Sequence, residues 1–213
     1  MPTLPNTQSV KPTVRRMTID DVPGVVALQR ACFPPPFPED SLFNPSHVSM
    51  HVSIFPPGQF VAATADGQIV ASSTAMLLSS DRWVKHLPFL DATGGLALTR
   101  HETVGDVLCG IDISVHPDYR GQGLAGLLYK ERFNLVHEKQ LRLYGTVCRM
   151  PDFASEPHGL TTSGYAQSVA DGWRKDRTLT PLLRIGLTYR GVIDGYIRDA
   201  ESGNAGAILE WAP

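Results

Sequence analysis

Residues 107–138 read VLCGIDISVHPDYRGQGLAGLLYKERFNLVHE. The apolar run 107–115 has the length and the β-branched content of a buried strand. Pro117 lacks a backbone N–H and biases His116 away from helix, so we expect the strand to end there. After the glycines, leucine and valine fall mostly on one helical face and charged residues largely on another. The stretch therefore predicts a strand, a glycine-rich turn and a helix.

The predicted turn is suited to binding an anion. The first N–H groups of a helix have no intrahelical partner, and the helix dipole favours negative charge at that end. Glycines allow the backbone to approach a phosphate closely. Arg120 adds a positive charge at the start of the turn. A tight connection without a ligand is the alternative, and this combination of residue types makes it the weaker one.

The glycines match two kinds of phosphate binder. Residues 121–126 spell G-x-G-x-x-G, the dinucleotide fingerprint. That fingerprint needs its first glycine directly after a strand and an acidic residue about 20 positions on. Here five residues separate the predicted strand from Gly121, and the next predicted strand, 141–147, contains no Asp or Glu. A dinucleotide-binding oxidoreductase is therefore the least favoured function.

The better match covers more residues. Residues 111–125, IDISVHPDYRGQGLA, resemble the acetyl-CoA-binding motif of the GCN5-related N-acetyltransferases (GNAT family). That motif is a strand ending in V-x-P-x-y, followed by Q/R-x-x-G-x-G/A. Arg120, Gly123 and Ala125 occupy its three marked positions. The order of predicted elements from Val14 to Trp211 also agrees with this family, and the chain resembles the acetyltransferase domains found beside carbon–nitrogen hydrolases.

The resemblance implies an α/β fold of the α+β type. We expect a mixed, mostly antiparallel twisted sheet of about seven strands, flanked by about four helices, with two splayed central strands. Residues 1–12 are expected to form a flexible leader and residues 13–213 a single acetyltransferase-like domain. Residues 149–177 replace a short connection of the family, so we interpret them as an insertion. It is a candidate for substrate selection, with a solvated excursion or a dimer contact as the alternative.

Local signals predict the remaining elements. Ser46 is expected to cap a helix over 46–54, and Asp66-Gly67 to turn a hairpin. The proline-rich segment 32–38 is either a stiff surface connection or a wall on the substrate side. The other expected elements are a strand at 14–17, a helix from Thr18 to Ala31, a short helix at 96–100, a helical piece at 168–173, a short helix capped by Thr178 or Thr180, and strands at 188–193 and 205–211.

The resemblance also assigns the cofactor site. Acetyl-CoA is the implied cosubstrate. Backbone groups of Ile113, Ser114 and Val115 would pair with the pantetheine amides. Backbone N–H groups would hold the pyrophosphate over the turn and the first helical residues, namely Arg120, Gly121, Gln122, Gly123, Leu124, Ala125 and Gly126.

The general base and acid are less clear. One branch of the family uses a glutamate where this chain has Cys109, and a widespread tyrosine is replaced by Leu182. Asp112 is the candidate base, because it is the sole carboxylate within the predicted central strand and burial would raise its pKa. A purely structural, paired carboxylate is the alternative, as is a base acting through ordered water. The candidate acids are Tyr144, Tyr165, Tyr189 and His158.

Composition limits the partners. With 213 residues and a net charge of -2, the chain is poorly suited to bind nucleic acid by bulk electrostatics. It contains no run of 18 apolar residues, so we expect no membrane partner. Three scattered cysteines predict neither a disulfide framework nor a metal site, and cytoplasmic residence is the default. His47 and His51 have the i, i+4 spacing of metal ligands, but no third ligand is near, so we interpret them as surface histidines.

Three functions follow from these observations. The first is an N-acetyltransferase that moves an acetyl or related acyl group from coenzyme A to a primary amine of a small molecule or peptide. The second is a non-catalytic acyl-CoA-binding or regulatory module, favoured by the missing glutamate and tyrosine. The third is the oxidoreductase considered above. A homodimer is compatible with each of them.

Overall fold

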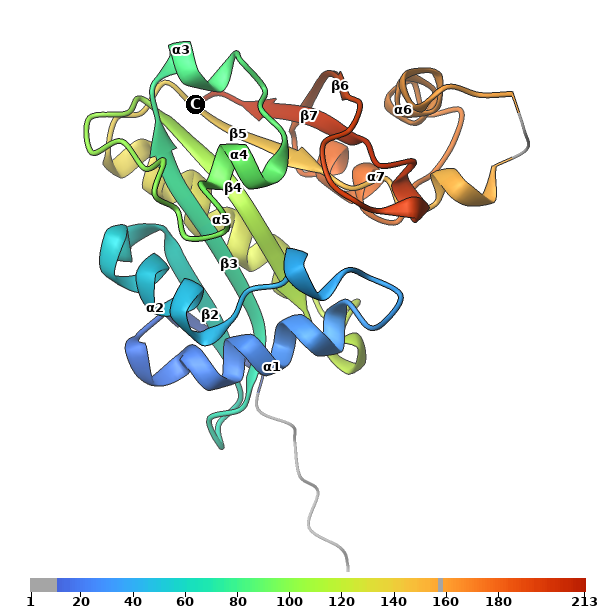
Figure 1. The fold of residues 1–213 in the computed structure, drawn as a ribbon. Helices are drawn as coiled ribbons and strands as arrows, with labels where there is room; N and C mark the ends of the chain where they lie inside the picture. The colour runs from blue at the N-terminus through green and yellow to red at the C-terminus, as the bar shows by residue number, and fades with distance from the viewer. Residues whose placement is uncertain (1–10, 157–158) are drawn as a thin grey trace, which may run out of the picture.

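A seven-stranded mixed sheet organises the molecule, in a computed structural model that describes residues 11–156 and 159–213 (Figure 1). The strand order is β1-β2-β3-β4-β5-β7-β6, and every neighbouring pair is antiparallel except β4 and β5. This confirms the expected fold class. The strands are β1 Thr13–Arg16, β2 Gln59–Ala63, β3 Ile69–Leu78, β4 Val107–Val115, β5 Leu143–Cys148, β6 Thr188–Ile193 and β7 Gly206–Trp211.

Helices cover both faces of the sheet. Helices α1 to α4 lie on the face turned to the viewer in Figure 1, and α5 lies behind the sheet. Four helices have nine residues or more, in line with the expected number. The helices are α1 Val22–Cys32, α2 Pro45–Ile54, α3 Ser80–Trp83, α4 Phe89–Thr93, α5 Leu124–Glu138, α6 Thr162–Ala170 and α7 Leu179–Arg184.

The core lies on either side of the central strands. All ten residues of β3 are buried, as expected for a strand covered on both faces. Leu77 and Leu108 pack among residues of α5, whereas Met76 and Cys109 pack against Trp83 on the opposite face. The central strands are therefore fixed by packing on both faces, which holds their backbone in place for a ligand.

A β-bulge bends β4 at its midpoint. Thr74 of β3 faces Asp112, while the next residue of β3 faces Gly110, so Ile111 is the extra residue. The bulge turns the side chains of Ile111 and Asp112 toward the same face of the sheet. Behind it, Arg132 of α5 donates hydrogen bonds to the carbonyl oxygens of Thr74 and Asp112. A buried guanidinium thus satisfies the carbonyls that the bulge exposes.

The central strands separate beyond the bulge. Strand β5 pairs with β4 in parallel only as far as Thr146 opposite Gly110, and the Thr146 hydroxyl donates to the Gly110 carbonyl at 3.0 Å. Strand β4 continues to Val115 without a partner on that side, while β5 pairs onward with β7. The predicted splay is confirmed, and it leaves a gap between two fixed strands.

Two predicted helices are wrong in detail. Helix α2 is capped by Asn44, whose side chain accepts from the N–H of His47 at 2.9 Å, and not by Ser46. Pro45 at the first helical position fixes a helical φ one residue earlier than expected. Residues 96–100 do not form a helix, because Leu96 and Leu98 have φ values of 72° and 56°. The helix of this region is α4, which comes before them.

The predicted surface position of His51 is also wrong. The side chain is fully buried, and its Nε2 lies 2.6 Å from the carbonyl oxygen of Leu96. Burial lowers the pKa of His51 to about 4, so the ring is neutral at physiological pH. This histidine tethers α2 to the segment that follows α4.

Residues 149–177 join the core. Tyr165 of α6 is completely buried and its hydroxyl donates to Asp176 at 3.0 Å, while Met150 is buried in the same hydrophobic cluster. Trp173 is the large apolar side chain of this segment that stays exposed, with 82% of its surface accessible. The segment is thus largely packed against β6 and α7 and is not a solvated excursion.

Most of the expected leader and one candidate proton donor lie outside the residues that the structure describes. Residues 1–10 of the leader and His158 are not described. Among the described residues, no helix is both long enough and apolar enough to cross a bilayer.

Candidate functional site

The glycine turn leads into the N-terminus of α5 as expected. A short 3-10 helix, Pro117–Tyr119, follows β4, and Gly121 and Gly123 then take φ values of 76° and 81°. These left-handed conformations suit glycine far better than other residues. A Cβ added at Gly121, Gly123 or Gly126 would meet no atom within 4 Å. The turn is therefore open on its outer side and admits a ligand close to the backbone.

Backbone donors of this turn are unpaired. In the described part of the chain, no N–H group from Gly121 to Gly126 donates to a protein acceptor, and the first helical bond runs from Leu127 to Gly123. Six consecutive unpaired N–H groups at the positive end of a 15-residue helix form a nest that is suited to an anion. Arg120 is exposed next to them, and its Nε donates to the Val115 carbonyl at 3.2 Å. The predicted phosphate-binding residues are thus brought together.

The predicted pantetheine-binding strand borders the gap between β4 and β5. Ile113 and Val115 turn their side chains toward Leu124 and Leu128 of α5, so the turn and the strand are packed as one unit. One correction concerns the Val115 carbonyl, which already accepts from Arg120 and, at 3.3 Å, from the Cys32 thiol. The Val115 carbonyl oxygen is therefore not available to a ligand.

Asp112 lies on the face of the sheet covered by α1. Its carboxylate accepts from the Ser114 hydroxyl at 3.1 Å, and Ser114 in turn accepts from Gln29 of α1 at 3.3 Å. Burial raises the pKa of Asp112 to about 6, although the bonds from Ser114 and Gln29 and the charge of Arg132 oppose this. The residue as a whole is partly buried, and with this pKa its carboxyl is mostly ionised at pH 7.

Several other sequence candidates are not positioned for proton transfer. Burial raises the pKa of the Cys109 thiol to about 12, which leaves it protonated and a poor base. The Tyr144 hydroxyl accepts from Arg132 at 2.8 Å inside the core, and that of Tyr165 is bonded to Asp176. Leu182 is buried among apolar side chains. Neither Tyr144 nor Tyr165 lines the hollow that opens on the face of the sheet covered by α1 to α4.

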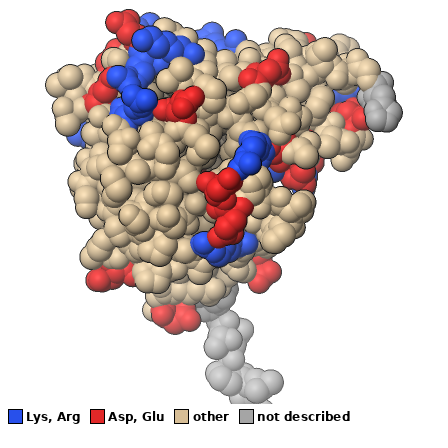
Figure 2. Space-filling view, in the orientation of Figure 1, with Lys and Arg blue, Asp and Glu red and all other residues tan. Residues whose placement is uncertain are grey.

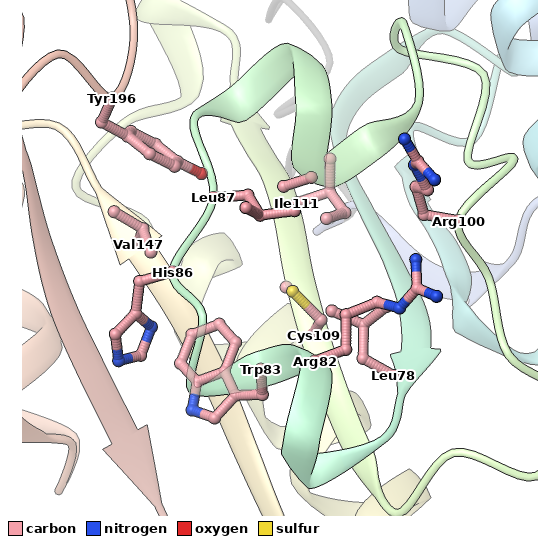
Figure 3. Close-up of a pocket in the computed structure, with 12 residues that line it drawn as sticks. Leu78, Arg82, Trp83, His86, Leu87, Arg100, Cys109, Ile111, Val147 and Tyr196 are labelled. Atoms are coloured by element: carbon pink, nitrogen blue, oxygen red, sulfur yellow. The ribbon is translucent and has the colours of Figure 1, made fainter.

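That hollow lies where β4 and β5 begin to separate (Figure 3). Gly110 and Ile111 of β4 and Val147 of β5 form its floor, and Tyr196 from the β6–β7 connection points its hydroxyl toward it in Figure 3. Sequence reasoning missed Tyr196 and Arg100 as site residues. Trp83 and His86, from the long connection between β3 and β4, also line the hollow.

Comparison with known sequences gives two relatives. No protein-family model matches the chain. The protein named Uncharacterized N-acetyltransferase YkwB, from Bacillus subtilis, is 33% identical over 200 residues, which cover 93% of this chain and 88% of YkwB. Probable hydrolase YhcX of the same organism is 27% identical over 202 residues, but the match spans only 38% of its length. The second match agrees with the resemblance to acetyltransferase domains that stand beside hydrolases.

Solved structures agree on the fold. The GNAT-like decarboxylase GphF, solved in complex with isobutyryl-CoA, superposes with a TM-score of 0.79 at 21% identity. The match covers 94% of this chain and 98% of GphF. The sheet order, the splay, the glycine turn and the N-acetyltransferase relative that matches almost the whole chain lead to one assignment. The chain belongs to the GCN5-related N-acetyltransferase (GNAT) family.

Proposed function

We propose that this protein is an acyl-CoA-dependent N-acyltransferase that transfers an acetyl or related acyl group directly to a primary amine. The observation that carries the proposal is the nest of unpaired N–H groups from Gly121 to Gly126, placed at the mouth of the gap between β4 and β5. A pyrophosphate fits the nest, and an extended arm fits the gap. We also propose that residues 13–213 form one acyltransferase domain.

Binding in this arrangement uses mainly backbone groups. The N–H groups of Gly121 to Gly126 would hold the pyrophosphate, because the N–H of Arg120 already donates to the Pro117 carbonyl at 3.3 Å. The Arg120 side chain would add charge. The free edge of β4 at Ile113 and Ser114 would pair with the amides of the pantetheine arm, as one strand pairs with another. These groups hold the thioester at the bulge, next to Asp112. Their contribution is to fix both reactants in one orientation.

Transfer then requires one proton acceptor and one proton donor. Asp112 would take a proton from the substrate ammonium. The amine nitrogen then attacks the thioester carbonyl carbon and forms the C–N bond while the C–S bond breaks. The sulfur leaves as a thiolate and takes up the second proton, which the attacking nitrogen loses as it becomes an amide. A carboxyl with a pKa of about 6 is ionised at pH 7 and still close enough to that pH to act efficiently.

The first test is thermal unfolding with acetyl-CoA, CoA and NAD. A ligand that binds only the folded state raises the unfolding midpoint. We expect a rise with both forms of coenzyme A and none with NAD. Absence of any rise with acetyl-CoA would overturn the proposal.

A second test separates an enzyme from a binding module. Release of the CoA thiol is measured with a panel of primary amines, each compared with a reaction that lacks the amine. Amine-dependent thiol release supports transfer. Tight acetyl-CoA binding without release across small amines, amino acids and peptides would favour the non-catalytic alternative.

A further inference from the structure

The hollow of Figure 3 has an apolar centre. Figure 3 shows Leu87, Ile111 and Cys109 in its middle, with Tyr196 on one side and Arg100 on the other. Because burial raises the pKa of the Cys109 thiol to about 12, this group is uncharged as well. The hollow therefore offers mainly apolar surface. Its lining consists of Leu78, Arg82, Trp83, His86, Leu87, Ala92, Arg100, Cys109, Gly110, Ile111, Val147 and Tyr196.

The charged groups of the lining lie at its rim. Arg82 lies 2.7 Å from Glu102, and Arg100 is exposed. Figure 2 shows Lys and Arg side chains gathered at the surface around α3, and an arginine can line an apolar space with its stem while its charge stays in water. Among the described residues, no Asp or Glu lines the hollow, so it is poorly suited to an ammonium group.

Tyr196 and His86 form an uncharged wall of the hollow. Burial raises the pKa of Tyr196 and lowers that of His86, although the charge of Glu210 opposes the second shift. Both rings are held by edge-on packing, Tyr196 against Phe89 with centroids 5.9 Å apart and His86 against Trp83 at 5.2 Å. A wall of fixed rings limits the size of a group that enters the hollow.

The proposed path of the pantetheine arm ends beside this hollow. In the proposed function, Ile113 and Ser114 pair with the arm, and the thioester lies at the bulge next to Asp112. Strands β4 and β5 are joined again at Gly110 opposite Thr146, so a group carried past the bulge cannot continue between the strands. It has to leave the sheet through one of the two faces.

One of these faces is closed. On the side of α5, a Cβ added at Gly110 would collide with the Tyr144 hydroxyl, which accepts from the buried Arg132 at 2.8 Å. On the opposite side, Gly110 and Ile111 border the hollow. The bulge turns the side chains of Ile111 and Asp112 to that same side. The acyl group of a thioester at the bulge is therefore directed into the hollow.

The size of the hollow sets the length of that acyl group. Its volume is about 30 Å³. Since a water-sized group takes up about 10–15 Å³ of such a volume, two or three carbon atoms fit. An acetyl group has one carbon beyond its carbonyl and would leave most of the hollow empty. Acyl groups of three or four carbons have two or three, which would fill it.

We propose that the hollow binds the acyl chain of the donor and selects aliphatic acyl groups of three or four carbons over acetyl. This inference rests on the proposed function and narrows its donor class. Each methylene moved from water into an apolar site strengthens binding by about fourfold. A chain of six carbons is longer than the hollow and gains nothing further from it.

The test is a series of donors of rising length. Calorimetric Kd values are measured for CoA and for acetyl-, propionyl-, butyryl- and hexanoyl-CoA without an acceptor, so the result does not depend on turnover. We expect butyryl-CoA to bind about tenfold more tightly than acetyl-CoA, with propionyl-CoA between them. Hexanoyl-CoA should bind no more tightly than butyryl-CoA.

Two variants change the hollow in opposite directions. Ala92→Leu adds three carbon atoms to the wall formed by α4, and Leu87→Ala removes three from the centre. We expect the first to reduce the preference for butyryl-CoA over acetyl-CoA to about threefold or less. The second should make hexanoyl-CoA bind more tightly than butyryl-CoA. Ala154→Leu is the matched control, because Ala154 is exposed and outside the lining, and it should keep the parent series.

Each outcome decides the question. A preference for butyryl-CoA that either variant shifts in the stated direction supports the inference. Butyryl-CoA that binds no more tightly than acetyl-CoA, or a preference that neither variant shifts, overturns it.

A second arm tests the acceptor as the occupant. Leucinamide is compared with glycinamide as acceptor of the acetyl group. A flat donor series, together with a preference for leucinamide that Ala92→Leu abolishes, would assign the hollow to the acceptor and overturn the inference. Binding of acetyl-CoA with a flat donor series removes only this inference, whereas no binding of any coenzyme A form would remove the proposed function.

Discussion

At the scale of single residues, the environment of Asp112 decides its role. Its carboxylate bonds to Ser114, which bonds to Gln29, and Arg132 holds the carbonyl of the same residue from the other face. An aspartate on an exposed strand would keep the usual pKa of about 4. Burial at the bulge raises its pKa to about 6, into the range of a general base.

Replacing Asp112→Asn should therefore separate activity from stability. We expect kcat to fall by about 100-fold or more and the acidic limb of the pH–rate profile, near pH 6, to disappear. A carboxyl whose pKa is raised by folding stabilises the fold below about pH 4, and this contribution is lost as the pH rises through 6. The variant should thus unfold at a higher temperature than the parent at pH 8 but not at pH 4.

The control for this experiment is Asp118→Asn. Asp118 is a nearby carboxylate whose side chain is 83% exposed, so its loss should change neither the profile nor the midpoint appreciably. Full activity of Asp112→Asn with an unchanged acidic limb would return Asp112 to a structural role.

At the scale of elements, the N-terminus of α5 begins a helix of the fold and is the proposed pyrophosphate site, and one substitution can separate these two roles. Gly126 is the third residue of the helix, and its side-chain position is open. A glycine inside a helix costs stability relative to most residues, and an acidic residue in the first turn is favoured by the dipole. Replacing Gly126 should therefore increase the stability of the helix, but it should weaken the proposed binding of a pyrophosphate.

We expect Gly126→Glu to be more stable than the parent by about 0.5–1 kcal/mol. The same carboxylate would repel a pyrophosphate, so the affinity for CoA should fall by about tenfold or more. Urea unfolding and calorimetric CoA binding are the two measurements. Gly126→Gln is the control, since it adds a side chain of similar size without charge. If Gln and Glu weaken CoA binding equally, steric exclusion and not charge explains the loss.

At the scale of the whole molecule, a cluster around Arg149 joins three distant parts of the chain. The guanidinium bonds to both oxygens of Asp199 at 2.7 and 2.8 Å. It also lies over the rings of Phe33 and Phe37, 5.5 and 5.0 Å from their centroids. The proline-rich segment after α1 is therefore tied to the end of β5 and to the β6–β7 connection, which carries Tyr196. Pro34, Pro35 and Pro36 are exposed, so a stiff surface connection and a wall on the substrate side both remain predictions for this segment.

Replacing Asp199→Asn should weaken this connection in a pH-dependent way. Burial alone would raise the pKa of Asp199, but the bonds from Arg149 and Ser202 lower it below its usual value. A lowered carboxyl pKa stabilises the fold above the pKa of the unfolded chain, and the contribution is lost as the pH falls through the folded value. We expect the variant to lose about 1–3 kcal/mol at pH 7. The loss should be smaller at an acidic pH below the pKa of an unfolded aspartate, which is about 4.

Urea unfolding at the two pH values measures this loss. Glu201→Gln provides the comparison, because Glu201 is a more exposed partner of the same arginine, and surface pairs contribute about 0–1 kcal/mol. A loss at pH 7 that is no larger for Asp199→Asn than for Glu201→Gln would contradict the role given to this pair.

Much of the fold and of the candidate phosphate site could be predicted from local signals in the sequence. Pro117 ends a strand, the glycines at 121 and 123 permit left-handed conformations, and the apolar period of residues 124–138 specifies a helix that covers the sheet. These properties depend on neighbours in the chain, so the sequence by itself determined the strand, the turn, the helix and with them the family.

Only the tertiary structure decided the hollow of Figure 3 and the environment of Asp112. Arg100, His86 and Tyr196 have no common spacing, and they line one hollow because β4 and β5 separate beneath α4 and the β6–β7 connection. The bulge at Ile111 turns the side chain of Asp112 toward α1, and its pKa depends on burial there. Desolvation and charge compensation are properties of atoms that surround a group in space, and the order of residues along the chain does not contain them.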